Sequence, residues 1–189
     1  MIKSAKFVTS AATFDQVKKL PELPEYAFVG RSNVGKSSLL NMLVNQKNLA
    51  VTSSTPGRTR LINFFLVNNE IYFVDLPGYG FAKAAKSTKD GWNDNIGEYL
   101  TTSRNLKKVF VLLDIRIAPT DNDIAMLHFL QANNIAFRII ATKADKLSRA
   151  AAHTARTKLA TTLGLASTDV ILSSSKDKLG RAEILDNLT

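Results

Sequence analysis

GRSNVGKSS, from Gly30 to Ser38, follows a short apolar run, Tyr26 to Val29, that has the composition of a buried strand. The stretch fits the pattern G-x-x-x-x-G-K-[ST], whose glycines let backbone amides approach phosphate oxygens closely. In this pattern the lysine neutralises the β and γ phosphates of a nucleotide, and the serine hydroxyl ligates Mg²⁺. A helix is expected from Lys36 to Asn45, and its N-terminus adds positive potential at the same place. The expected phosphate contacts come from Gly30, Arg31, Ser32, Asn33, Val34, Gly35, Lys36, Ser37 and Ser38.

Short apolar runs alternate with longer amphipathic ones along the rest of the chain, as in proteins that alternate strands and helices. Strands are expected at 26–29, 61–67, 71–75, 109–114, 137–142 and 169–173, and helices at 36–45, 92–103, 121–132, 148–163 and 181–188. Only Asn68 to Glu70 separate the second strand from the third, which predicts an antiparallel hairpin, whereas the other spacings suit helical crossovers. The predicted fold class is therefore α/β, with a six-stranded, mostly parallel sheet, one antiparallel edge strand and helices on both faces.

The composition limits the possible functions. With 189 residues, 45% of them hydrophobic, the chain is long enough for one well-buried domain, expected to span residues 1–189. The absence of cysteine excludes disulfides, thiolate catalysis and Cys-containing zinc sites, and only His128 and His153 could supply imidazole ligands. No apolar run suits a signal peptide or a membrane span, so we expect a cytoplasmic protein without integral membrane contact.

The formal net charge of +9 exceeds what one bound nucleotide needs. It indicates an anionic partner larger than a nucleotide, with a generally basic surface as the alternative. Lys83, Lys86 and Lys89 lie in a polar segment after the third predicted strand, where the state of a bound nucleotide could reposition them as a basic surface. A solvated run of charges is the competing interpretation of these lysines.

A second phosphate-contacting segment, DLPG from Asp75 to Gly78, ends the third predicted strand. There Asp75 is placed to hold Mg²⁺ through water, and the Gly78 amide to meet a γ-phosphate. In the polar segment STPGRTR, between the two phosphate segments, Thr59 is the candidate for a second hydroxyl ligand of Mg²⁺; Thr55 competes, but lies farther from the strand. The residues expected around the nucleotide here are Gly57, Arg58, Thr59, Arg60, Leu61, Asp75, Leu76, Pro77 and Gly78. The candidate catalytic residues at the phosphates are Lys36, Thr59 and Gly78.

The base is read by segments later in the chain. TKAD, from Thr142 to Asp145, ends the fifth predicted strand, and a carboxylate there can accept hydrogen bonds from the N1–H and the exocyclic N2 amine of guanine. Adenine has neither donor in that position, so the motif favours a guanine nucleotide. Lys143 can lay its stem over the base, and a backbone amide of the serine-rich turn after the sixth strand can reach the guanine O6. The expected base contacts come from Thr142, Lys143, Ala144, Asp145, Ser173, Ser174 and Ser175.

In this order the segments resemble those of the EngB (YihA/YsxC) family of bacterial ribosome-biogenesis GTPases. The resemblance covers nearly the whole chain and rests on GRSNVGKSSLLN, TPGRTRLINFF, VDLPGYGFAK, LLDIRIAPTDND and TKADKL; in the last, Thr142 replaces the commoner asparagine and leaves Asp145 as the main guanine reader. It implies a monomeric, Ras-like P-loop GTPase domain that hydrolyses GTP to GDP and phosphate with Mg²⁺. It further implies a switch in assembly of the large ribosomal subunit, whose precursor (rRNA and ribosomal proteins) is the partner, and a need for normal cell division and septation.

Ras-like enzymes carry a glutamine just after D-x-x-G to orient the attacking water, and this chain has Tyr79 there. A phenol is a poor replacement, so hydrolysis is expected to be slow and to depend on a partner or an ion. Related GTPases with asparagine at the position of Asn33 use it to ligate K⁺, which offsets charge developing between the β and γ phosphates. The resemblance thus implies K⁺-stimulated hydrolysis, with Asn33 as a further catalytic residue. In the alternative, Asn33 only hydrogen-bonds the neighbouring switch backbone.

Two other function classes are compatible with parts of the sequence. A P-loop ATPase or small-molecule kinase shares the phosphate loop, but TKAD and the lack of an acceptor-binding or lid insertion disfavour it. A GTP-dependent scaffold at the septum or membrane fits the septation phenotypes of the family, but the chain has no amphipathic basic helix or lipidation motif. Binding to ribosomal particles rather than to lipid vesicles separates the ribosomal role from the scaffold.

Overall fold

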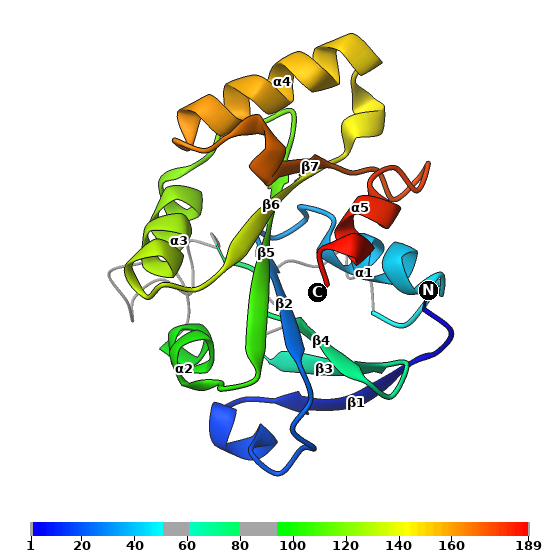
Figure 1. Cartoon of the computed structure of the whole chain (residues 1–189), viewed down its shortest axis with the longest axis vertical. Coiled ribbons are helices and arrows are strands. Elements are labelled where there is room, and N and C mark those ends of the chain that lie inside the picture. Colours follow the sequence, from blue (N-terminus) through cyan, green and yellow to red (C-terminus); the bar gives the residue numbers. More distant parts are fainter. Residues whose placement is uncertain (1, 51–60, 80–93, 189) are drawn as a thin grey trace.

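In the computed structural model, residues 2–50, 61–79 and 94–188 are described, and they form a seven-stranded sheet with helices on both faces (Figure 1). The strands are β1 (Ala5–Ala11), β2 (Glu25–Gly30), β3 (Ile62–Val67), β4 (Ile71–Asp75), β5 (Leu106–Asp114), β6 (Phe137–Thr142) and β7 (Val170–Leu172). The helices are α1 (Lys36–Val44), α2 (Asp94–Thr102), α3 (Asp121–Ala132), α4 (Arg149–Thr162) and α5 (Arg181–Asp186). Short 3₁₀ helices lie at Phe14–Val17, Ala144–Lys146 and Ser167–Asp169.

The order of the strands confirms the predicted α/β class. Across the sheet the order is β1-β3-β4-β2-β5-β6-β7. Strands β4, β2, β5, β6 and β7 are mutually parallel, whereas β3 pairs antiparallel with both β1 and β4. Because the parallel strands point the same way, their carboxyl ends meet at one edge of the sheet.

The sheet differs from the predicted one by a seventh strand, β1, at its edge. The strand expected at the edge, β3, is consequently second from the edge and is paired on both sides. In the sequence of β1, AKFVTSA, apolar and polar residues do not alternate clearly. In the structure the register of its pairing with β3 shifts between Phe7 and Thr9, and Phe7 is 53% exposed. A bulged edge strand buries few side chains, so it leaves only a weak pattern in the sequence.

Two hydrophobic clusters hold the strands in place, one on each face of the sheet. Alternate residues of β2 show the division: Ala27 and Val29 join the cluster formed with α2, α3 and α4, and Tyr26 and Phe28 join the one formed with α1 and α5. Figure 1 shows α2 and α3 on one side of the sheet and α1 and α5 on the other. Burying one side chain as large as Phe28 contributes about 1.5–3 kcal/mol, so the central strands are strongly fixed.

Local sequence sets the ends of several helices. Thr120 precedes α3, and Asp123 Oδ2 accepts its backbone N–H at 2.8 Å, which confirms the predicted capping box. Ser148 precedes α4, and its hydroxyl accepts the N–H of Ala151 at 3.2 Å. The predicted start of the second helix at Trp92 lies outside the described residues, which enter that helix at Asp94.

Candidate nucleotide-binding site

The predicted site segments lie together at the carboxyl edge of the parallel strands. The phosphate loop follows β2, the D-x-x-G segment begins at the end of β4, TKAD begins at the end of β6, and the serine-rich turn follows β7. The parallel pairing of Phe28 with Asp75 and of Asp114 with Thr142 aligns these ends. Open α/β sheets bind ligands at this edge, so the structure places the phosphate and base segments where one nucleotide can contact both.

The phosphate loop takes its shape from two residues with left-handed backbone. Gly35 has a φ of 103° and Asn33 a φ of 63°, a region that glycine adopts freely and asparagine more readily than most residues. Val34, between them, is buried in the cluster with α1. Helix α1 begins directly afterwards, so its first-turn amides, which have no partner inside the helix, adjoin the loop. Such a loop and helix start suit the oxygens of a phosphate chain.

Lys36, the first residue of α1, forms an ion pair with Asp75, the last residue of β4. Both side chains are largely buried, with 13% and 8% of their surface exposed. Ser37 follows Lys36 and is half-buried. Hydroxyl and carboxylate oxygens are ligands that Mg²⁺ prefers, so Ser37 and Asp75 suit the ion, and the Lys36 ammonium suits the β and γ phosphates.

Tyr79 stands at the position where Ras-like enzymes carry a water-orienting glutamine, and its side chain faces the core. The residue is 2% exposed, and its hydroxyl donates to Asp123 Oδ1 at 2.8 Å. Burial and the neighbouring Asp123 carboxylate raise the pKa of the Tyr79 phenol well above its usual range. The backbone is held as well, since the Tyr79 N–H donates to the Gly30 carbonyl at 3.3 Å and the Tyr79 carbonyl accepts from the Ser32 N–H at 3.4 Å. In this position the phenol anchors the segment after D-x-x-G to the start of α3.

Gly78, the glycine of D-x-x-G, lies against the phosphate loop. A Cβ atom added to it would lie 3.2 Å from both the backbone N and the Oγ of Ser32, and 3.4 Å from the Gly30 carbonyl oxygen. These separations leave little room for any side chain. Gly78, whose amide is predicted to meet a γ-phosphate, therefore packs closely against the phosphate loop.

At the base-binding end, Thr142 and Lys143 both contact the phosphate loop. Thr142 is 5% exposed, and its hydroxyl lies 2.7 Å from the Val34 carbonyl oxygen and 3.1 Å from that of Leu113. Lys143 has a φ of 61°, and its Nζ donates to the Asn33 carbonyl oxygen at 2.9 Å. The Thr142 hydroxyl thus joins the base-binding motif to the phosphate loop by a hydrogen bond.

Asp145 carries the carboxylate expected to read guanine. Its Oδ1 accepts the Ser174 hydroxyl at 3.1 Å, and its Oδ2 lies 3.4 Å from Lys146 Nζ. Burial works to raise the pKa of Asp145, but the hydrogen bonds from Ser174 and Lys146 outweigh it, so the pKa lies below its ordinary value. The Ser174 hydroxyl in turn accepts the Asp177 N–H at 3.2 Å. The sequence placed Ser174 at the site, but its hydroxyl contact with Asp145 becomes visible only in the fold.

Comparisons with known proteins decide the family. Residues 25–143 match the family described as 50S ribosome-binding GTPase. A probable GTP-binding protein EngB of Caldanaerobacter subterraneus subsp. tengcongensis is 46% identical over 184 residues, which cover 97% of this chain and 94% of the relative. The corresponding protein of Geobacter metallireducens is 49% identical over 183 residues, covering 97% of this chain and 89% of the relative. The chain belongs to the EngB family.

As a member of the EngB family, the chain is a P-loop enzyme that hydrolyses GTP. A crystal structure of a probable GTP-binding protein engB superposes with a TM-score of 0.68, covering 87% of this chain and 95% of that chain at 23% identity. This likeness concerns the fold, and it confirms the predicted Ras-like architecture. GTPases of this kind use Mg²⁺, and the oxygen ligands of Ser37 and Asp75 agree with that use.

Several predicted site residues lie outside the described residues. They are Thr55, Gly57, Arg58, Thr59, Arg60, Lys83, Lys86 and Lys89. Among the described ones, Leu61 is 38% exposed, whereas the Leu76 side chain is buried in the core. Only the backbone of Leu76 is therefore suited to face a nucleotide. Ser38 and Ser175 are exposed, as expected for residues that border a binding site.

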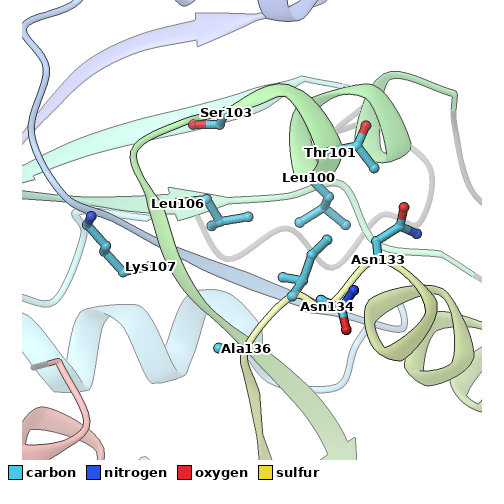
Figure 2. Close-up of a pocket in the computed structure, with 9 residues that line it drawn as sticks. Leu100, Thr101, Ser103, Leu106, Lys107, Asn133, Asn134 and Ala136 are labelled. Atoms are coloured by element: carbon cyan, nitrogen blue, oxygen red, sulfur yellow. The ribbon is translucent and has the colours of Figure 1, made fainter.

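A separate cavity of about 310 Å³ lies beside the amino end of β5, away from the carboxyl edge that carries the nucleotide site (Figure 2). Leu100, Leu106 and Ile135 line it together with polar residues such as Lys107 and Asn133. These residues come from the end of α2, the start of β5 and the connection between α3 and β6. The cavity shares no residue with the candidate nucleotide site.

Among the residues that the structure describes, none of the helices has the length and apolar character needed to cross a bilayer.

Proposed function

We propose that this GTPase is a nucleotide-controlled switch in assembly of the large ribosomal subunit, acting in the cytoplasm as a monomer with one domain over residues 1–189. Its partner is the subunit precursor, through rRNA and ribosomal proteins, and its action is needed for normal cell division and septation. The ribosome-binding description of the matched family supports this role. The net charge of +9 supports it as well, because basic side chains bind the phosphate backbone of RNA.

The oriented carboxylate of Asp145 carries the proposal of a guanine nucleotide. Ser174 holds Oδ1, and Lys146 lies beside Oδ2, so the group is ionised and its plane is restrained. An ionised carboxylate accepts two hydrogen bonds from the N1–H and N2 amine of guanine, and adenine cannot supply them. Lys143, bonded to the phosphate loop, places its stem beside the same base.

The phosphate end supplies charge and position. Lys36 exchanges Asp75 for the β and γ phosphates, and the loop amides hold the remaining oxygens. Ser37 and Thr59 offer hydroxyl ligands to Mg²⁺, and Asp75 holds it through water. When bound, Mg²⁺ neutralises the charge that develops on the phosphates during transfer. The Gly78 amide meets the γ-phosphate, so the segment after β4 responds to whether GTP or GDP is present.

Slow hydrolysis that depends on K⁺ is the second part of the proposal. Tyr79 is bonded to Asp123 in the core, which supports the expectation that it does not orient water. The Asn33 side chain is exposed on the phosphate loop, where its amide oxygen can ligate a cation near the β and γ phosphates. Asn33→Ala should abolish stimulation by K⁺ without abolishing nucleotide binding. Equal turnover of the wild-type protein in KCl and NaCl would contradict this part.

Co-sedimentation with ribosomal particles tests the switch role. The protein is loaded with a GTP analogue or with GDP and mixed with large-subunit precursors at several salt concentrations. We expect tighter binding in the GTP-analogue state and a fall in affinity with salt, as for a partner rich in phosphate. Equal binding in both nucleotide states would contradict the switch. Recovery with lipid vesicles in place of ribosomal particles would favour a membrane-associated scaffold.

A further inference from the structure

Asp114, the last residue of β5, lies beside the base-binding motif without belonging to it. The parallel register pairs Asp114 with Thr142, so the next residue of the neighbouring strand end is Lys143. Asp114 is only 9% exposed, and a buried carboxylate is costly unless donors satisfy it. The sequence DIR, from Asp114 to Arg116, has no role in the nucleotide site predicted from the sequence.

Two cations and one backbone amide satisfy the Asp114 carboxylate. Arg116 donates from Nε to Oδ1 at 2.9 Å and from Nη2 to Oδ2 at 2.7 Å, and its backbone N–H lies 3.1 Å from Oδ1. Lys143 Nζ lies 3.1 Å from Oδ2. Burial acts to raise the pKa of Asp114, but the donors of Arg116 and Lys143 outweigh it and hold the pKa well below its ordinary value. The group is therefore a charged acceptor, and the two-pronged contact with Arg116 fixes its plane.

Lys143 connects this carboxylate with the phosphate loop. Its ammonium donates to the Asn33 carbonyl oxygen at 2.9 Å and contacts Asp114 Oδ2 at 3.1 Å. Asn33 and Lys143 both have left-handed backbone, with φ values of 63° and 61°. Such a conformation persists when surrounding contacts hold it, so the directions of the Asn33 carbonyl and the Lys143 side chain depend on those contacts. A lysine stem is flexible and loses that freedom only when its ammonium is held. The position of the ammonium therefore depends on Asp114 as well as on the loop.

We propose that Asp114 is a positioning residue for nucleotide retention: held by Arg116, it keeps the Lys143 ammonium on the Asn33 carbonyl and so joins the base-binding end to the phosphate loop. The inference rests on the proposed guanine site. Without the carboxylate, Lys143 beside the base and Asn33 in the loop both lose a fixed partner. The effect is on how fast GDP leaves, because neither Asp114 nor Arg116 is among the residues placed at the phosphates.

Dissociation of a fluorescent GDP analogue from the full chain tests this inference. The variants are Asp114→Asn, Lys143→Met and the two combined. Asp114→Asn should raise the dissociation rate about tenfold, the effect of losing one contact to a charged group. The double variant should be no faster than the faster single variant, because Asp114 acts through Lys143 and the first change already removes the contact. Asp114→Glu, which keeps the charge, should recover part of the loss.

Asp169→Asn is the matched control, because it removes the carboxylate of another arginine ion pair, the one with Arg138. Its dissociation rate should stay within about twofold of wild type. Rates that multiply in the double variant, or an unchanged rate in folded Asp114→Asn, would overturn the inference. If Asp114→Asn does not fold, Arg116→Gln frees the carboxylate without removing it: a smaller rise that disappears in the Lys143→Met background supports the inference, and no rise overturns it.

Base preference separates this inference from the guanine site on which it rests. The Asp114 and Arg116 variants should still prefer GDP to xanthosine diphosphate, since Asp145 and Ser174 are untouched. A dissociation effect without a change in preference supports the positioning role alone. A change of preference in the Asp114 variants would show that Asp114 reads the base itself, which contradicts the proposed division of roles.

Discussion

The base-binding end and the phosphate-binding end of the site differ in how their polar side chains are satisfied. At the base-binding end, Asp145 is held by Ser174, and Lys143 is held by Asp114 and the Asn33 carbonyl. At the phosphate-binding end, Lys36 and Asp75 are ion-paired with each other, although one is expected to contact phosphate and the other Mg²⁺. One end is supported by the surrounding protein, whereas the other contains groups that must exchange partners.

This difference assigns separate tasks to the two ends. Groups already held in place lose little conformational freedom on binding, so the base-binding end is suited to provide specificity. At the other end, moving Lys36 from Asp75 to phosphate alters contacts at the end of β4, next to Gly78 and Tyr79. Those residues contact the phosphate loop through Gly30 and Ser32. The phosphate-binding end is therefore suited to report which nucleotide is bound.

Lys36→Met should have the largest effect and tests the phosphate-binding end. The change removes the cation for the β and γ phosphates and leaves the Asp75 carboxylate, 8% exposed, without its ion-pair partner. GDP affinity measured by calorimetry should fall at least about a hundredfold. Lys176→Met removes an exposed lysine from the serine-rich turn and serves as the control. GDP affinity equal to wild type in Lys36→Met would break the proposed division between the two ends.

Tyr79→Phe should have a smaller effect, on stability rather than on turnover. It removes the donor to Asp123 Oδ1, and Asp123 is 1% exposed, so the free energy of unfolding in urea should fall by about 1–2 kcal/mol. GTP turnover should stay within about threefold, because the phenol faces the core. Tyr26→Phe, which removes the donor to the Leu188 carbonyl in the other cluster, is the matched control. A loss of turnover much larger than this in stable Tyr79→Phe would place the phenol in catalysis.

Glu25 is a buried carboxylate at the amino end of β2, the end of the strand away from the nucleotide site. Unlike Asp114 and Asp145, it has a raised pKa, because burial outweighs the hydrogen bonds from Ser103 and Tyr99. Its stabilising contribution is complete below the ordinary value of 4.5 and is lost as pH rises through the raised folded-state pKa. Glu25→Gln should therefore gain unfolding free energy relative to wild type as the pH rises from acidic to neutral.

Urea unfolding at a series of pH values measures this difference. Glu70→Gln, in the exposed turn between β3 and β4, controls for the general effect of removing one negative charge. A stability difference between Glu25→Gln and wild type that stays constant across the range would show that Glu25 is no less ionised in the folded protein than in the unfolded chain.

The sequence predicted the parallel strands and the site motifs because those features are local. The phosphate loop, DLPG and TKAD each combine an apolar strand with polar residues at its carboxyl end, and burial on both faces makes such strands easy to see. Strand β1 was missed because its register shifts near Phe7 and little of it is buried. An edge strand of this kind is defined by its partner, β3, more than by its own composition.

The missed details of the site involve partners far apart in the chain. The direction of the Tyr79 phenol is set by its hydrogen bond to Asp123, 44 residues later in the chain. No local sequence pattern predicts a hydrogen bond between residues so far apart. The contact of Ser174 with Asp145 spans 29 residues. Asp114 and Arg116 are two residues apart in sequence, but the contact of Asp114 with Lys143 follows from the pairing of β5 and β6. Residue types predicted the chemistry, and tertiary packing decided which side chains support it.

Nucleotide preference of Asp145→Asn tests most directly whether the base-binding end reads guanine. An amide in place of the carboxylate presents a donor to the guanine N1–H and N2 groups, whereas xanthine offers an acceptor where guanine carries its amine. Competition between GDP and xanthosine diphosphate should shift from strong preference for GDP in the wild type to preference for the xanthine nucleotide in the variant, with the fold intact by circular dichroism. Retention of the preference for GDP in folded Asp145→Asn would contradict the assignment.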